Sequence, residues 1–326
     1  MIALGLDVGG TSTRAVLVDE SGACLAVGGA GGGNWITSTP DACVTAVRSA
    51  VGAALAAAGS SAAAVAGWTL AMAGLPDGEQ AGLGRALLGL GLGPPVFASD
   101  VLAAFCSGTW RADGYALVVG TGAVAARIEG GREAAIADGR GWLLGDDGSG
   151  FWIGQRVVRA ALADLDGRGP ATALTELVWS RAAADHPTLV GIDRRTVAGA
   201  LAEALYRERP VALARFAPDA FAAARADDEV ARGILERAAA ALARTLATVL
   251  AGQALPVVIS GGVAGRNPRL AQAIVDRLPS GATGEVQLVA DGAAGAAALA
   301  LRNVGVPVDA EVFGRIVATK GVSGAP

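Results

Sequence analysis

The chain has 326 residues, which is long enough for two domains of ordinary size, each with its own core. Its formal net charge is −4 and it contains no block of Lys or Arg, so neither nucleic acid nor an anionic membrane surface is an expected partner. The sole lysine, Lys320, lies near the C-terminus, which excludes a Walker-type loop and a protein-kinase nucleotide site, since both need a lysine within or soon after a strand.

The first third of the chain predicts a mixed sheet with helical crossovers, because three short strands precede one helix and strands then alternate with helices. Thr39-Pro40-Asp41 is a typical helix start. The expected strands cover residues 2–8, 14–19, 24–29, 67–71 and 96–98, and the expected helices cover 41–58, 77–90 and a segment that begins near residue 100.

A glycine-rich turn follows the first of these strands. It combines an acid, two glycines and three hydroxyls: Asp7, Gly9, Gly10, Thr11, Ser12 and Thr13. The glycines let the backbone bend and approach a ligand closely, so that N–H groups and hydroxyls can converge on phosphate oxygens. Asp7, at the strand end, is then placed to hold hydrated magnesium. An ordinary hairpin turn between the two strands is the alternative interpretation.

No membrane segment or secretory signal is expected. The uncharged run over residues 49–76 is mainly Ala, Gly and Ser and is interrupted near Gly59, so a helix, a turn and a buried strand explain it better than a transmembrane helix. Met1 leads directly into a strand without a basic region or a cleavage site.

The strand–turn–strand pattern occurs a second time in the middle of the chain. An apolar strand over 115–119 leads into Gly120-Thr121-Gly122, and a second strand covers 124–128. Two such units suggest duplicated lobes that face each other across a cleft, although two hairpins alone do not prove a duplication. A mostly helical stretch follows over 150–253, in which 228–250 is a convincing amphipathic helix.

A third turn that could face a ligand lies near the end of the chain. A buried strand over 257–260 ends in Gly261-Gly262, and a helix follows Asn267-Pro268. A strand-to-helix turn of any α/β fold is the alternative. The last strand ends at Leu288 and Val289, a helix covers 291–303, and the tail beyond Gly305 remains unassigned.

The cysteines and the single histidine point to no chemistry of their own. Cys24, Cys43 and Cys106 are too widely spaced for a zinc knuckle and odd in number for a disulfide framework, so we interpret them as small buried hydrophobes in a reducing, cytoplasmic setting. His186 follows Asp185 in an expected surface loop, so we interpret it as a surface residue rather than as a catalyst or metal ligand.

Taken together, these turns resemble the sugar kinase/Hsp70/actin ATPase superfamily, and most closely its BadF/BadG-type branch, which contains N-acetylglucosamine kinase. The motifs that carry the resemblance are the Asp7 turn, Gly33-Asn34-Trp35, Ser99-Asp100, Gly120-Thr121-Gly122, the run 141–154 and Gly261-Gly262. The resemblance implies an α/β fold of two actin-like (ribonuclease H-like) lobes with mixed sheets, helical crossovers and an active-site cleft between them. It divides the chain into an N-terminal lobe over 1–113, a C-terminal lobe over 114–304 that forms a homodimer, and a tail over 305–326 that packs back on the first lobe.

The resemblance also assigns roles in ATP-dependent phosphoryl transfer. Asp100 matches the catalytic base, which accepts the proton of the sugar hydroxyl. An Asp at a helix start is equally typical of an N-cap, which is the alternative. Asp7 matches the magnesium-side acid, Gly9–Thr13 the first phosphate turn, Gly120-Thr121-Gly122 the second, and Gly261-Gly262 the adenosine-facing loop.

A further set of residues matches the sugar site of the family. Asn34 and Asp146 correspond to positions that hydrogen-bond sugar hydroxyls, while Asp147 is the alternative main ligand and Ser149 supports the loop. Trp35 either flanks the sugar ring or is a packing plug. Thr121 and the residue two positions on, Ala123, face the sugar side of the cleft. There the sequence departs from the family.

N-acetylglucosamine kinases usually carry serine at the position of Ala123, so recognition of the 2-substituent is open. The expected reaction is phosphorylation of the 6-hydroxyl of N-acetylglucosamine or a close analogue by ATP with Mg²⁺. Glucosamine, muramic acid and another hexose remain alternative substrates. A sugar-sensing regulator without turnover and a dehydratase-activating ATPase, which would need cysteines for an iron–sulfur cluster, are alternatives of other classes.

Overall fold

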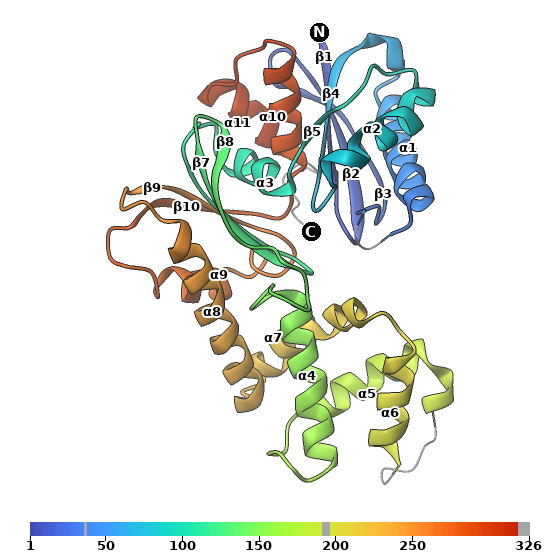
Figure 1. Ribbon diagram of the computed structural model, residues 1–326, viewed down its shortest axis with the longest axis vertical. Coiled ribbons are helices and arrows are strands. Elements are labelled where there is room, and N and C mark those ends of the chain that lie inside the picture. The colour runs from blue at the N-terminus through green and yellow to red at the C-terminus, as the bar shows by residue number, and fades with distance from the viewer. Residues whose placement is uncertain (36–37, 191–195, 319–326) are drawn as a thin grey trace.

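Figure 1 shows a computed structural model of the chain, which describes residues 1–35, 38–190 and 196–318. The expected tail over 305–326 and Lys320 therefore lie partly or wholly outside the described residues. The molecule is elongated, with one sheet and its helices at one end, a second sheet in the middle and a group of helices at the other end.

The N-terminal sheet has five strands in the order β3-β2-β1-β4-β5. β1 pairs antiparallel with β2 and parallel with β4, so the sheet is mixed as expected. The strands are β1 (Ile2–Val8), β2 (Ser12–Asp19), β3 (Cys24–Gly31), β4 (Val65–Met72) and β5 (Val96–Ala98), and the helices are α1 (Pro40–Ala57) and α2 (Asp77–Leu87). The Thr39 hydroxyl caps α1 by accepting from the N–H of Ala42 at 3.3 Å, which confirms the predicted helix start.

The C-terminal sheet repeats this topology. Its strands are β6 (Gly114–Val119), β7 (Ala123–Glu129), β8 (Arg132–Asp138), β9 (Leu255–Ser260) and β10 (Thr283–Val289), in the order β10-β9-β6-β7-β8. β6 pairs antiparallel with β7 and parallel with β9, as β1 does with β2 and β4. The prediction of two lobes with mixed sheets is confirmed.

Two helices, α3 (Asp100–Gly108) and α10 (Ala293–Asn303), cross between the two sheets (Figure 1). Their backbones meet closely, because a Cβ atom at Gly295 would lie 1.9 Å from the carbonyl oxygen of Ala103. The N–H of Gly295 also donates to Ser107 Oγ at 2.8 Å. Only glycine permits this approach, so the two helices between the sheets are in direct backbone contact.

The helical region after β8 forms the end of the molecule farthest from the N-terminal sheet (Figure 1). It contains α4 (Gly150–Leu165), α5 (Leu174–Asp185), α6 (Val197–Tyr206), α7 (Ala217–Arg225) and α8 (Glu229–Val249). α8 packs against the other helices through Ile234 and against the C-terminal sheet through Leu246. The Asp228 carboxylate caps α8 by accepting from Ala231 N–H at 2.8 Å, as the predicted amphipathic helix requires.

Three elements remain, and two of them, a strand and a helix, had no counterpart in the sequence prediction. α9 (Pro268–Val275) follows β9 as expected. The edge strand β8 was not predicted, and neither was α11 (Ala310–Ala318), whose Ile316 packs with Val16 and Val18 of β2. Within the described ranges, no helix is long and apolar enough to cross a membrane.

The cysteines and the histidine occupy structural positions. Cys43 and Cys106 are buried, Cys24 is half-buried, and all three are free thiols. His186 is half-buried rather than fully exposed, with its Nε2 atom 2.6 Å from Glu208 Oε1.

Candidate active site

The first turn predicted to bind phosphate, Gly9–Thr13, joins β1 and β2 at the carboxyl end of β1. The N–H of Gly9 donates to the carbonyl of Ser12 at 2.9 Å, which closes a four-residue loop between the paired residues Val8 and Thr13. Gly10, Thr11 and Ser12 are exposed, so they present their polar groups to solvent, whereas Thr13 is fully buried. The Thr13 hydroxyl has no hydrogen-bond partner among the described residues.

Asp7 lies at the base of this turn, where three parts of the chain meet. Its Oδ2 atom accepts from the N–H of Gly292, just before α10, at 2.8 Å. Burial and the nearby charge of Asp291 raise the pKa of Asp7 to about 7, and the charge of Asp100 adds to the shift. Asp291 forms an ion pair with Arg14, whose Nη1 lies 2.9 Å from Asp291 Oδ2. The site therefore gathers negative charge.

Asp100 is the first residue of α3 and does not cap it. The cap is Ser99, whose Oγ accepts from the N–H of Leu102 at 3.0 Å, so the alternative interpretation of Asp100 as an N-cap is wrong. Burial raises the pKa of Asp100 to about 6, opposed by hydrogen bonding to the Val101 N–H and assisted by the charge of Glu133. The Ser99 hydroxyl also donates to the Glu133 carboxylate on β8, which ties the start of α3 to the second sheet.

The second turn predicted to bind phosphate, Gly120–Gly122, joins β6 and β7 and is hydrogen-bonded to the start of α4. The N–H of Gly120 donates to the carbonyl of Gly122 at 3.0 Å. The carbonyls of Gly120 and Thr121 accept from the N–H groups of Gly150 and Phe151 at 2.8 and 3.1 Å. Two carbonyls of the turn are therefore hydrogen-bonded to the first residues of α4, and these bonds orient the turn relative to that helix.

Asp146 lies directly beneath this turn, whereas its neighbour Asp147 is exposed. Asp146 Oδ1 accepts from the N–H of Ala123 at 3.3 Å, and a Cβ atom at Gly122 would lie 2.8 Å from Asp146 Oδ2. Burial raises the pKa of Asp146. The Asp138 carboxylate accepts from the N–H groups of Asp146 and Asp147 at 2.8 and 3.2 Å, so it orders the backbone of this loop.

The remaining predicted sugar residues are largely enclosed. Asn34 is buried, its N–H donates to the Gly9 carbonyl at 3.1 Å, and its Nδ2 donates to the Ala73 carbonyl at 3.2 Å. Trp35 is half-buried and packs against the N-terminal core. Ser149 is fully buried and caps α4 by accepting from the Trp152 N–H at 3.2 Å, so its hydroxyl supports the loop.

The third predicted turn lies against the second. Gly261 has φ +95°, and a Cβ atom there would lie 2.4 Å from the Val119 carbonyl oxygen. The same carbonyl accepts from the Val263 N–H at 3.0 Å. Gly262 is exposed and has open space where a Cβ would stand. A flat ligand could therefore approach the backbone here.

Sequence reasoning missed three carboxylates in this region: Glu133, Asp138 and Asp291. The only available signal was Asp291-Gly292, an acid and a glycine directly after a strand, which the sequence indicated merely as a helix start. In the described part of the chain, no group of three or more His, Cys, Asp or Glu residues is arranged to hold a metal ion.

Comparisons with known proteins show what the chain is similar to. The model of the BadF/BadG/BcrA/BcrD ATPase family matches residues 4–300. An N-acetyl-D-glucosamine kinase from Dictyostelium discoideum is 29% identical over 221 residues, 63% of this chain and 65% of that protein. An N-acetylmuramic acid/N-acetylglucosamine kinase from Clostridium acetobutylicum is 34% identical over 84 residues, 26% of this chain and 27% of that protein. The matched parts thus span less than two thirds of either relative.

Solved structures resemble the whole chain. A protein from Chromobacterium violaceum, provisionally named N-acetylglucosamine kinase, superposes with a TM-score of 0.69 at 28% identity and covers 92% of this chain and 98% of that one. A ROK family glucokinase from Streptomyces griseus, solved with glucose and AMPPNP, shares the fold with a TM-score of 0.55 at 20% identity, covering 93% of this chain and 100% of that one.

Proposed function

The chain belongs to the BadF/BadG/BcrA/BcrD ATPase family, and from this premise we propose that it is an ATP-dependent amino-sugar kinase. The observation that carries the proposal is Asp100, a half-buried carboxylate that is not needed as a helix cap and whose pKa is raised to about 6. Asp100 is close enough to Asp7 for its charge to raise the pKa of Asp7 further. A base in this position suits transfer to a hydroxyl group.

In the proposed reaction, the 6-hydroxyl oxygen of the sugar attacks the γ-phosphorus of ATP. A new oxygen–phosphorus bond forms as the bond from the γ-phosphorus to the bridging oxygen breaks, and ADP leaves with that oxygen. The Asp100 carboxylate accepts the hydroxyl proton. A sugar hydroxyl is a poor nucleophile near neutral pH, so a base at this step contributes about 100-fold to 10,000-fold in rate.

The two phosphate turns orient the triphosphate in this proposal. Exposed N–H groups and hydroxyls at Gly10, Thr11 and Ser12 would bind it from the first lobe, and the turn at Gly120–Gly122 from the second. The open backbone at Gly262 would receive the purine. The positions of the two turns support this role. Each turn follows the central strand of its sheet, and the two sheets have the same topology.

Asp7 fits a hydrated magnesium ion. It supplies a hard oxygen ligand in a region where burial and neighbouring carboxylates raise its pKa, and a divalent cation would offset both effects. Bound magnesium would neutralise charge on the β- and γ-phosphates. The Asp7 carboxylate would hold the ion, and the Gly292 N–H, which donates to Asp7 Oδ2, orients that carboxylate.

Asn34 and Asp146 support a polyol such as a sugar as the acceptor, since both are buried polar residues beside the turns. Among amino sugars we favour N-acetylglucosamine on the names of the relatives. Ala123 is 3% exposed, and its methyl side chain has no group that could hydrogen-bond a 2-substituent. Glucosamine, muramic acid and other hexoses therefore belong in the test. A homodimer in the cytoplasm completes the proposal.

The two alternative functions, a dehydratase-activating ATPase and a regulator without turnover, gain no support from the cysteines or from Asp100. A dehydratase-activating ATPase would need cysteines that hold a cluster, but Cys43 and Cys106 are buried in separate cores. A regulator without turnover has no need for a base such as Asp100.

A coupled ADP-release assay tests the proposal with glucosamine, N-acetylglucosamine, N-acetylmannosamine, muramic acid and glucose. We expect at least one sugar to stimulate ATP turnover, and Asp100→Asn to abolish the stimulation. Asp41→Asn is the matched control, because Asp41 stands in the first turn of α1 but is exposed. If no sugar stimulates turnover, the kinase proposal fails. If Asp100→Asn remains fully active, the base lies elsewhere.

A further inference from the structure

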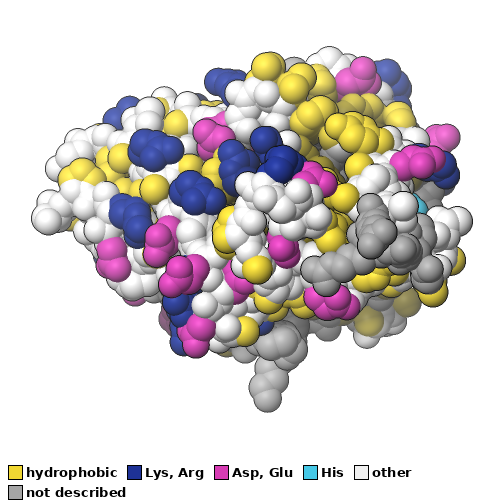
Figure 2. Space-filling view, turned by 90° about the horizontal axis from the view of Figure 1, so that it is seen from below, with side chains coloured by type: hydrophobic (Ala, Val, Ile, Leu, Met, Phe, Trp, Pro, Cys, Tyr) yellow, Lys and Arg dark blue, Asp and Glu magenta, His cyan; other side chains and the backbone are white. Residues whose placement is uncertain are grey.

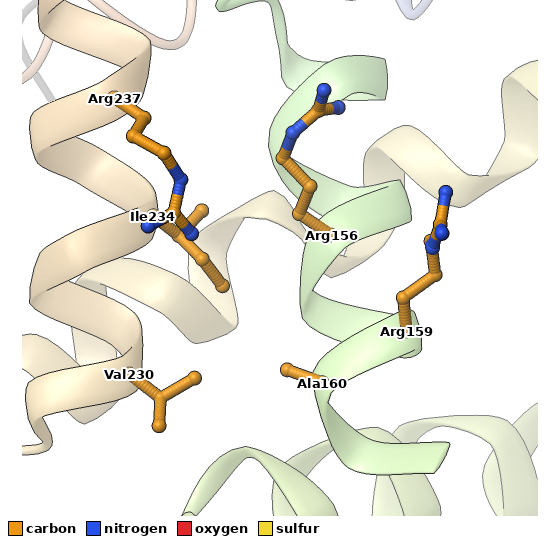
Figure 3. A pocket seen from close by; sticks show the side chains of 6 residues that line it. All are labelled: Arg156, Arg159, Ala160, Val230, Ile234 and Arg237. Atoms are coloured by element: carbon orange, nitrogen blue, oxygen red, sulfur yellow. The ribbon is translucent and has the colours of Figure 1, made fainter. Parts of the chain in front are cut away.

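A pocket of about 310 Å³ lies between α4 and α8, in the helical region. Its wall is made of three arginines and three apolar residues: Arg156, Arg159, Arg237, Ala160, Val230 and Ile234. Figure 3 shows Arg156 and Arg159 extending in the same direction from α4, and Arg237 reaching from α8 toward the space between the two helices. None of these residues belongs to the predicted nucleotide or sugar site.

Arg156 is held in place by its own helix. Its Cζ atom stands 3.3 Å from the centroid of the Trp152 ring, and its Nη1 donates to the Trp152 carbonyl at 3.1 Å. Burial lowers the pKa of Arg156, and the charges of Arg159 and Arg237 lower it further, against the opposite effect of Asp147. Like charges therefore meet at this pocket, and one of them is fixed before any ligand binds.

These arginines lack the carboxylate partners that others nearby have. Arg181 pairs with Asp219 at 2.6 Å, and Arg215 lies 3.0 Å from Asp185. By contrast, the guanidinium groups of the pocket form no ion pair with any residue that the structure describes. Figure 2 shows basic side chains gathered on the face seen from below, at the end of the molecule where the helical region lies. Arg159 and Arg237 are exposed and Arg156 is half-buried, so the donors of all three are accessible to an anion, whose charge would offset the repulsion among them.

We propose that this pocket binds the phosphate monoester of a small metabolite. Guanidinium groups bind phosphate oxygens through paired N–H donors, and three of them match the two charges of a monoester better than the single charge of a carboxylate. The volume of about 310 Å³ equals roughly ten water molecules, more than a phosphate group alone fills. Val230, Ile234 and Ala160 supply an apolar surface for the carbon skeleton.

The proposal is independent of the kinase function, since it uses no residue of the active site. Isothermal titration calorimetry with glucose 6-phosphate tests it on the full chain, with ADP and glucose present at saturation to fill the proposed active site. Inorganic phosphate is titrated separately. The pocket variant is Arg159→Gln/Arg237→Gln, and the matched control is Arg225→Gln/Arg244→Gln, which removes two charges from exposed positions on α7 and α8.

We expect glucose 6-phosphate to bind the native protein, the pocket variant to raise Kd about tenfold or more, and the control to stay within about twofold, because each lost charge-assisted contact weakens binding substantially. If the double variant fails to fold, Arg237→Gln alone serves the same comparison. Absence of binding, equal binding by the pocket variant, or binding of inorganic phosphate without glucose 6-phosphate would each overturn the proposal.

Discussion

The two sheets share one topology but differ at the turn that follows their first strand. In the N-terminal sheet, Val8 pairs with Thr13, so the turn has four residues. In the C-terminal sheet, Val119 pairs with Ala123, so the turn has three. The first turn presents exposed hydroxyls, whereas the second is built of two glycines and Thr121, with its carbonyls bonded to the start of α4.

The charged groups differ as well. Asp7 stands two residues before Gly9, but the residue two before Gly120 is Val118. Asp291 and Asp100 join Asp7 on the first side, since their charges raise its pKa. The first turn thus has three carboxylates near its base, one of which, Asp291, comes from the segment after β10, whereas the second turn lies above the buried carboxylate of Asp146. Under the proposed function, the first side would carry the chemistry and the second turn would orient the triphosphate.

Asp100→Asn would have the largest effect. It tests whether the first side of the site supplies the base. We expect kcat to fall about 100-fold to 10,000-fold with little change in thermal stability, because an amide cannot accept the proton. Steady-state kinetics beside Asp41→Asn measure it. Near-native kcat in Asp100→Asn would remove the distinction between the lobes.

Gly295→Ala tests whether the two lobes depend on the α3–α10 crossing. A methyl group there would meet the Ala103 carbonyl at 1.9 Å, so we expect a loss of about 1–3 kcal/mol in the free energy of unfolding. Gly199→Ala, at an exposed position inside α6 with open space, should gain about 0.5–1 kcal/mol. Urea unfolding measures the free energy of unfolding of both variants. Equal values for the two would contradict the expected clash at Gly295.

Gly122→Ala and Gly120→Ala separate two glycines of the second turn. An added methyl at Gly122 would press on Asp146 Oδ2 at 2.8 Å, while Gly120 has open space. We expect Gly122→Ala to raise the sugar KM about tenfold, because small displacements of positioning residues are costly, and Gly120→Ala to have less effect. An equal change in KM in both variants would mean that Asp146 is not the affected ligand.

The smallest effect concerns the link between the lobes at Glu133. Asp100 must be ionised to act as a base, so kcat/KM should decline as the pH falls through about 6. Glu133→Gln removes a negative charge that raises the pKa of Asp100, and the decline should therefore move to lower pH. Glu129→Gln, an exposed carboxylate at the end of β7, is the control in the pH–rate profile. An unchanged or upward-shifted profile in Glu133→Gln would contradict this.

Sequence patterns predicted most of the fold because the inner strands are apolar runs bounded by turn residues. The bounds of β1 and β5 agree with the prediction. The sequence analysis did not predict β8, because it is an edge strand that carries charged residues, REAAIAD, and leaves Ile136 exposed. Charged side chains suit an edge but resemble a loop in the sequence.

The site was predictable only where a motif is continuous in the chain. Gly292, which donates to Asp7, is 285 residues from it in sequence, and Ser99 is 34 residues from Glu133. Such partners are set by how α3 and α10 pack between the sheets, which no local pattern reports. The resemblance to the family supplied the roles of the motifs, and the structure added the groups that raise the pKa of Asp7 and Asp100.

Phosphorus NMR of the reaction mixture tests the central claim most directly. The native protein is incubated with ATP, Mg²⁺ and each amino sugar in turn, and the products are compared with those of Asp100→Asn. The account predicts a sugar phosphate monoester in amounts equal to the ADP formed, and none above background from Asp100→Asn. ADP accompanied only by inorganic phosphate with every sugar, or sugar phosphate formed equally by Asp100→Asn, would contradict it.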